Sequence, residues 1–122
     1  MYQNHLAENL HKKISQMLII GFNGCSIDES SYLQEAIGQF NIGGVILFEH
    51  DGIERAVTKN IKTPSQLKQL TSSLKDLYYW TQTHNQLPLW IGVDYEGGQV
   101  TRLSHQLGFP EIPSPYQVAQ KG

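Results

Sequence analysis

The fold is decided by residues 88–103, which read PLWIGVDYEGGQVTRL, and by residues 42–48, which read IGGVILF. Each stretch contains a short apolar run with glycine or proline at its entrance. Such a run is typical of a strand that is buried on both faces in a parallel sheet. Between the two runs, TPSQ at residues 63–66 predicts a helix start, with Thr as N-cap, Pro at the first helical position and Gln where a capping box needs it. Strand, helix and strand in this order predict a parallel βαβ unit, and therefore an α/β fold.

Leucines at helical spacing follow this start and should form the buried face of its helix: Leu67, Leu70, Leu74 and Leu77. Near the N-terminus a similar stripe predicts an amphipathic helix that packs against a later part of the chain: Leu6, Leu10, Ile14, Met17 and Leu18. A second stripe, Leu33, Ile37 and Phe40, is preceded by three candidate N-caps, Asp28, Ser30 and Ser31. Residues 17–22 favour a short buried strand, and residues 49–62 have no clear period and predict a loop.

Size and charge narrow the class of protein. The chain has 122 residues, enough for one domain, and Lys+Arg 9 against Asp+Glu 11 gives a net charge of −2. A protein that neutralises nucleic-acid phosphates needs a basic excess, so nucleic acid is excluded as a partner. The single cysteine, Cys25, cannot form an internal disulfide. The apolar run at residues 17–20 is far shorter than the roughly 20 residues of a membrane span, and no signal peptide is indicated. We therefore expect a cytoplasmic protein, or an envelope or secreted protein if a signal was removed.

The candidate site begins at Asp94, where the second apolar run ends. Ligands of parallel α/β folds bind beyond the carboxyl ends of strands, where a carboxylate can bind sugar hydroxyls, a metal ion or a proton. Gly97 and Gly98 allow a sharp turn, after which Arg102 can return to the same place. The alternative is a solvated strand end with Arg102 merely paired to an acid.

Other kinds of site receive less support from the sequence. The five histidines show no paired metal-ligand spacing, so we expect no metal. The glycine pairs lack a phosphate-binding fingerprint, which leaves a nucleotide-binding domain as a weak alternative.

Taken together, residues 42–48, 63–67 and 88–103 closely resemble the N-terminal part of glycoside hydrolase family 3, in particular its β-N-acetylhexosaminidases (β-N-acetylglucosaminidases). The resemblance runs from about Ile14 to the end. It implies a (β/α)8 TIM barrel and hydrolysis of terminal β-linked N-acetylglucosamine with retention, through a covalent glycosyl-enzyme. By the same resemblance, the substrate-binding residues are Asp94, which binds hydroxyls of the non-reducing sugar, and Arg102, which lines the same subsite. The resemblance also implies that three motif residues shape the turn: Glu96, Gly97 and Gly98.

The family's catalytic groups have no counterpart in this sequence. The Lys-His motif, the His acid/base and the Asp nucleophile lie downstream of the matched segment in that family, and a barrel needs roughly 250 residues. We therefore expect residues 1–122 to be an N-terminal fragment of the catalytic domain, an incomplete barrel that is inactive alone. It should need no cofactor, contact a carbohydrate substrate and tend to self-associate through unpaired sheet edges.

The alternative hypothesis is a non-catalytic α/β binding or interaction module. Neither apolar run carries an edge-protecting charge or proline, which argues against such a module. The loop at residues 49–62 resembles the longer loop of some envelope-associated relatives.

Overall fold

The computed structural model describes residues 2–52, 58–81 and 87–121. In chain order they form α1 (Tyr2–Gln16), β1 (Ile19–Gly21), the 3₁₀ helix η1 (Ile27–Glu29), α2 (Ser31–Gly38), β2 (Gly44–Leu47), α3 (Pro64–Thr81), β3 (Trp90–Val93), β4 (Tyr95–Gly97), β5 (Val100–Thr101), the 3₁₀ helix η2 (His105–Leu107) and α4 (Pro115–Gln120).

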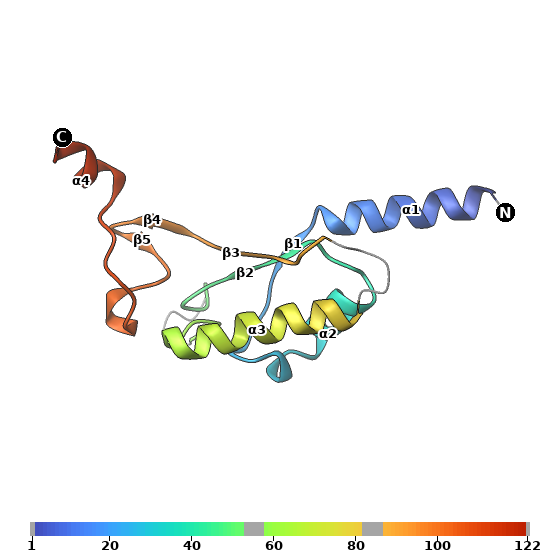
Figure 1. The fold of residues 1–122 in the computed structure, drawn as a ribbon, viewed down its shortest axis with the longest axis horizontal. Coiled ribbons are helices and arrows are strands. Elements are labelled where there is room, and N and C mark those ends of the chain that lie inside the picture. The colour runs from blue at the N-terminus through green and yellow to red at the C-terminus, as the bar shows by residue number, and fades with distance from the viewer. Residues whose placement is uncertain (1, 53–57, 82–86, 122) are drawn as a thin grey trace.

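Strands β1, β2 and β3 form one parallel sheet in that order. The register aligns Ile19 with Gly44 and Gly44 with Trp90. Helix α2 links β1 to β2, and α3 links β2 to β3, so the predicted parallel βαβ unit is confirmed and a second one precedes it. Figure 1 places both helices on the same side of the sheet.

The hydrophobic core lies between the sheet and these two helices. Strand β2 is buried along most of its length, as predicted. Leu70 and Leu74 of α3 are buried, and Leu67 and Leu77 pack against the same cluster, which confirms the predicted face of this helix. Helix α2 contributes Leu33 and Ile37, both fully buried, whereas Phe40 follows the helix and is 59% exposed.

The second face of the sheet is uncovered within the described residues. Ile19 is 60% exposed and Trp90 is 71% exposed, although each lies in a strand. Side chains alternate between the two faces of a strand, and here only the face of Ile20, Ile91 and Val93 meets the core. The prediction that residues 89–93 are buried on both faces is therefore wrong.

Helix α1 also differs from its prediction, because its apolar stripe is exposed at the positions whose side chains the structure describes. It projects away from the sheet in Figure 1, and Leu10, Ile14 and Met17 are 55%, 48% and 82% exposed. The side chain of Leu6 lies outside the described residues. Its C-terminal end is anchored, because Gln16 Nε2 donates to Asn41 O at 2.7 Å. None of the helices described is long and apolar enough to cross a membrane.

The start of α3 confirms half of the predicted capping box. Thr63 Oγ1 accepts from Gln66 N at 3.2 Å, as an N-cap should. The Gln66 side chain reaches one residue further than expected, because its Oε1 accepts from Lys62 N at 2.9 Å. Its Nε2 donates to Cys25 O at 2.7 Å, so this glutamine also ties α3 to the loop after β1.

Asn60 is the fully buried polar residue that joins the ends of two strands. Its Oδ1 accepts from Phe48 N, and its Nδ2 donates to Phe22 O and Gly24 O, each at 3.0 Å. Its own N–H donates to Phe48 O at 2.9 Å. The predicted loop at residues 49–62 therefore folds back onto β2, with an antiparallel bridge between His50 and Thr58; residues 53–57 lie outside the described part.

The isosteric substitution Asn60→Asp is expected to lower the free energy of unfolding by about 3 kcal/mol or more, because a carboxylate has no donor for the two carbonyls. The loss should grow as the pH rises above the ordinary carboxyl pKa, since only the protonated acid can donate. Urea unfolding at pH 4 and pH 7 measures both effects. The matched control is Asn23→Asp at an exposed position, which should cost less than about 0.5 kcal/mol. Equal costs for the two variants would contradict this role of Asn60.

Candidate functional site

The predicted site residues lie at the carboxyl end of the parallel sheet. Strand β3 ends at Val93, and Asp94 follows directly. The chain then forms an antiparallel hairpin of β4 and β5, in which Tyr95 pairs with Thr101. In Figure 1 this hairpin lies at the end of the molecule opposite to α1. This edge is where open parallel sheets bind ligands.

Two glycines form the tight turn of the hairpin. Gly97 and Gly98 have φ angles of +75° and +62°, a conformation that favours glycine. A Cβ on Gly97 would also lie 2.6 Å from Pro113 O, so the hairpin packs directly on the backbone of the segment before α4. The positive φ angles match the sharp turn predicted from the sequence. Glu96 lies exposed in the middle of β4.

Asp94 and Arg102 face each other across the base of the hairpin. Arg102 Nη2 lies 4.0 Å from Asp94 Oδ2, and the two side chains are 38% and 49% exposed. Because this contact is long and half-exposed, most of the carboxylate lone pairs and guanidinium donors stay available to a ligand. A pair of this kind contributes little to stability, typically about 0–1 kcal/mol.

Arg102 is positioned from its other side by the end of β2. Its guanidinium carbon lies 5.7 Å from the centroid of the Phe48 ring, within the range of a cation–π contact. Arg102 Nε is buried without a hydrogen-bond partner among the described residues. Lys59 Nζ lies 5.1 Å from the same ring. The site therefore joins the end of β2 to the hairpin that follows β3.

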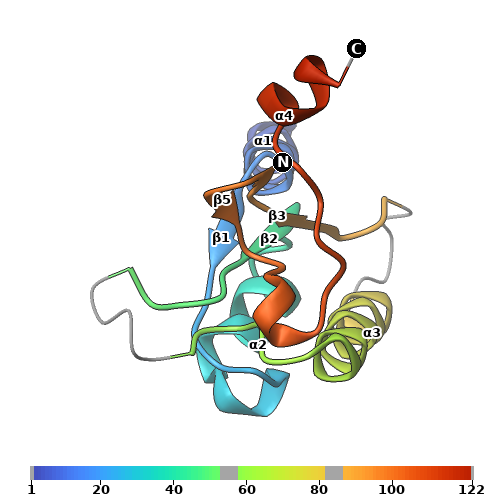
Figure 2. The ribbon, with the colours of Figure 1, turned by 90° about the vertical axis from the view of Figure 1, so that its left-hand side faces the viewer.

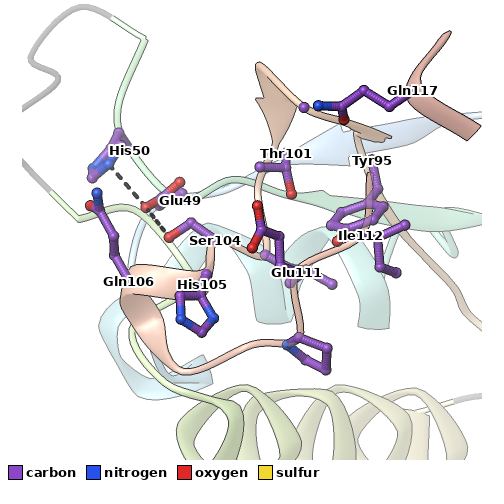
Figure 3. Close-up of a pocket in the computed structure, with 13 residues that line it drawn as sticks. Glu49, His50, Tyr95, Thr101, Ser104, His105, Gln106, Glu111, Ile112 and Gln117 are labelled. Carbon is purple, nitrogen blue, oxygen red and sulfur yellow. Dashed lines mark hydrogen bonds and ion pairs between the residues drawn. The ribbon is translucent and has the colours of Figure 1, made fainter. Parts of the chain in front are cut away.

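A cavity of about 460 Å³ opens on the other face of the hairpin (Figure 3). Tyr95 and Thr101 line it, whereas Asp94 and Arg102 do not. This separation follows from strand alternation, because each residue of the ion pair is the immediate neighbour of a cavity residue. The full lining is Glu49, His50, Tyr95, Gly98, Thr101, Leu103, Ser104, His105, Gln106, Pro110, Glu111, Ile112 and Gln117.

A small polar network closes one side of the cavity. Glu49 Oε1 accepts from Ser104 Oγ at 3.2 Å and lies 3.3 Å from His50 Nε2. These contacts, drawn as dashed lines in Figure 3, connect the second residue after β2 to the residue before η2. The sequence prediction missed this network, because residues 49 and 104 are far apart in the chain and belong to no recognisable motif.

The residues described provide no group of three or more His, Cys, Asp or Glu side chains that could hold a metal ion.

Cys25 lies in the loop after β1, where its N–H donates to Glu29 Oε2 at 3.0 Å. Burial raises the pKa of the Cys25 thiol, the opposite of what a nucleophile needs. The same N–H, together with the Ser26 hydroxyl, lowers the pKa of Glu29. These contacts stabilise the loop and supply no second reactive site.

Residues 9–120 match the family described as glycosyl hydrolase family 3 N terminal domain. Among individual proteins, the chain is 35% identical over 74 residues to beta-hexosaminidase A of Pseudoalteromonas piscicida, covering 61% of this chain and 10% of that protein. It is 40% identical over 72 residues to beta-hexosaminidase of Methylobacillus flagellatus, and the match covers 59% of this chain and 16% of that protein.

A solved structure shares the fold. The glycoside hydrolase family 3 beta-N-acetylglucosaminidase from Paenibacillus sp. str. FPU-7 matches with a TM-score of 0.69 and 30% identity, over 86% of this chain and 17% of that one. The chain thus spans less than a fifth of the length of each of these three proteins.

Substituting Gly97→Ala is expected to lower the free energy of unfolding by at least about 1–2 kcal/mol, the cost of a left-handed conformation for a residue with a Cβ. The contact with Pro113 O adds to this cost. Chemical denaturation measures it. Gly52→Ala is the matched control, because a Cβ there meets nothing within 4 Å. A loss at Gly52 as large as that at Gly97 would contradict the structure of the turn.

Replacing Asp94 by Asn should change the free energy of unfolding by less than about 1 kcal/mol, because the ion pair is long and half-exposed. Thermal and urea unfolding of the two proteins give the difference. A loss of about 3 kcal/mol, typical of breaking a buried pair, would show that Asp94 serves the fold and is not free for a ligand.

Proposed function

The chain belongs to glycosyl hydrolase family 3, whose N-terminal domain matches residues 9–120, and from this membership we propose that it supplies part of a site for terminal β-linked N-acetylglucosamine. Asp94 and Arg102 are the substrate-binding residues in this proposal. Glu96, Gly97 and Gly98 shape the hairpin that presents them.

The observation that carries the proposal is the position of the Asp94–Arg102 pair. The pair lies at the carboxyl edge of the sheet, half-exposed, with unused donors and acceptors. A carboxylate accepts hydrogen bonds from sugar hydroxyls, and a guanidinium donates to sugar oxygens. A matched structure of 30% identity is named a beta-N-acetylglucosaminidase, which supports the choice of sugar.

The uncovered sheet face supports an incomplete (β/α)8 barrel as the architecture. In such a barrel helices cover the outside of the sheet, and the other face turns inward. Helices α2 and α3 lie on one face of β1–β3 (Figure 2), and Ile19 and Trp90 on the other face are exposed. We assign the open face to the barrel interior.

Retaining hydrolysis requires a nucleophile and a general acid/base on either side of the glycosidic bond. The nucleophile and the general acid/base of the family have no matching residues in this sequence. We propose that the 122 residues bind the sugar without hydrolysing it, and that catalysis belongs to the longer proteins of the family.

The chain should bind methyl N-acetyl-β-D-glucosaminide, with chemical-shift changes at the backbone amides of Asp94 and Arg102 in a ¹H–¹⁵N NMR titration. Asp94→Asn should weaken binding at least tenfold, because a hydrogen bond to a charged group is worth about 1.5–3 kcal/mol. The control Asp76→Asn alters an exposed acid on α3 and should leave affinity unchanged. Equal affinity of the wild-type and Asp94→Asn proteins, measured from the shift at the Arg102 amide, would contradict the assignment.

Hydrolysis is tested separately with p-nitrophenyl N-acetyl-β-D-glucosaminide. We expect no release of p-nitrophenol above a control without protein. Turnover by the purified chain, retained after removal of any contaminating hydrolase, would refute the assignment of catalysis to the longer relatives.

A further inference from the structure

We propose that the cavity behind the hairpin is an accessory saccharide site that binds a neutral pyranose ring. It is separate from the Asp94–Arg102 pair, since these two residues do not line it. The inference rests on the proposed function for the class of ligand. The geometry of the cavity does not depend on the proposed function, because the cavity and the Asp94–Arg102 pair lie on opposite faces of the hairpin.

The charge of the lining selects a ligand without a negative group. The described residues around the cavity include Glu49 and Glu111 but no lysine or arginine. A phosphate or carboxylate would meet two carboxylates with no fixed cation to offset the repulsion. The hydroxyls of a neutral sugar can instead donate to these carboxylates. The volume of about 460 Å³ falls in the range of about 300–1,000 Å³ that is usual for small-molecule sites.

One polar atom of the lining has no partner without a ligand. Thr101 Oγ1 is buried and forms no hydrogen bond with the described residues. A buried hydroxyl that forms no hydrogen bond is costly, and a rotation of the Thr101 side chain toward the cavity would let this hydroxyl donate to or accept from a hydroxyl of the ligand. Thr101 of β5 and Glu111 of the segment before α4 both line the cavity (Figure 3). Two polar groups from different segments can therefore bind one ring.

Apolar groups in the same cavity match the C–H face of a pyranose. The Tyr95 side chain comes from β4, and Leu103, Pro110 and Ile112 lie along the segment that returns beneath it. Sites for small molecules typically combine such apolar walls with a few placed polar groups. Tyr95 pairs directly with Thr101 across the hairpin, so the two side chains lie on the same face of it.

The test uses the full chain with Asp94→Asn, which disables the proposed pair on the other face. N,N′-diacetylchitobiose is titrated and followed by ¹H–¹⁵N NMR. We expect shifts at the amides of Ser104, Glu111 and Gln117. Adding Thr101→Val should weaken binding at least tenfold, whereas the control Thr71→Val, on the surface of α3, should not. Glu111→Ala removes an exposed side chain and repeats the test should Thr101→Val fail to fold.

The proposal is overturned by the absence of binding in Asp94→Asn, or by shifts confined to Phe48 and Arg102 with no effect of Thr101→Val or Glu111→Ala. Inorganic phosphate that displaces the disaccharide from these amides would also overturn it, because it would identify an anion site. The first and third of these results leave the proposed function intact, since that function is tested by the loss of the shift at the Arg102 amide on Asp94→Asn in the otherwise unchanged chain. Shifts confined to Phe48 and Arg102 in Asp94→Asn would count against both proposals.

Discussion

The side-chain amide of Asn60 lies fully buried where the loop after β2 meets the ends of β1 and β2. It donates to Phe22 O and Gly24 O and accepts from Phe48 N, so its three hydrogen bonds fix two neighbouring strand ends to each other. A buried carbonyl or N–H without a partner is costly, and a single amide satisfies all three here.

The position of the candidate site depends on the end of β2 that Asn60 holds in place. Phe48 stacks beneath the Arg102 guanidinium, and the next residue, Glu49, bonds to Ser104. The end of β2 therefore contacts both faces of the hairpin that follows β3, one through an aromatic ring and the other through a carboxylate. The glycine turn at Gly97 packs the far end of the hairpin against Pro113. The ion pair and the cavity are thus positioned by backbone and core, although both are open to solvent.

The sequence predicted the elements whose signals are local. The glycine-led run gave β2, Thr63 and Pro64 marked the start of α3, and the end of the second run placed Asp94 at a strand end. The sequence could not predict whether other elements cover each apolar face of the sheet. A residue such as Trp90 is compatible both with a strand that is buried on two faces and with a strand that is exposed on one. The cavity was missed for a related reason, because its walls come from segments more than 40 residues apart, such as those of Glu49 and Ser104. The buried amide of Asn60 was also missed, because this residue lies in a polar loop with no period.

The most direct measurement is a crystal structure of the chain with N-acetylglucosamine. We predict sugar hydroxyls within about 3 Å of the Asp94 carboxylate and the Arg102 guanidinium, as in ordinary hydrogen bonds. A sugar that is ordered only elsewhere, with Asp94 and Arg102 contacting nothing but each other and water, would contradict it.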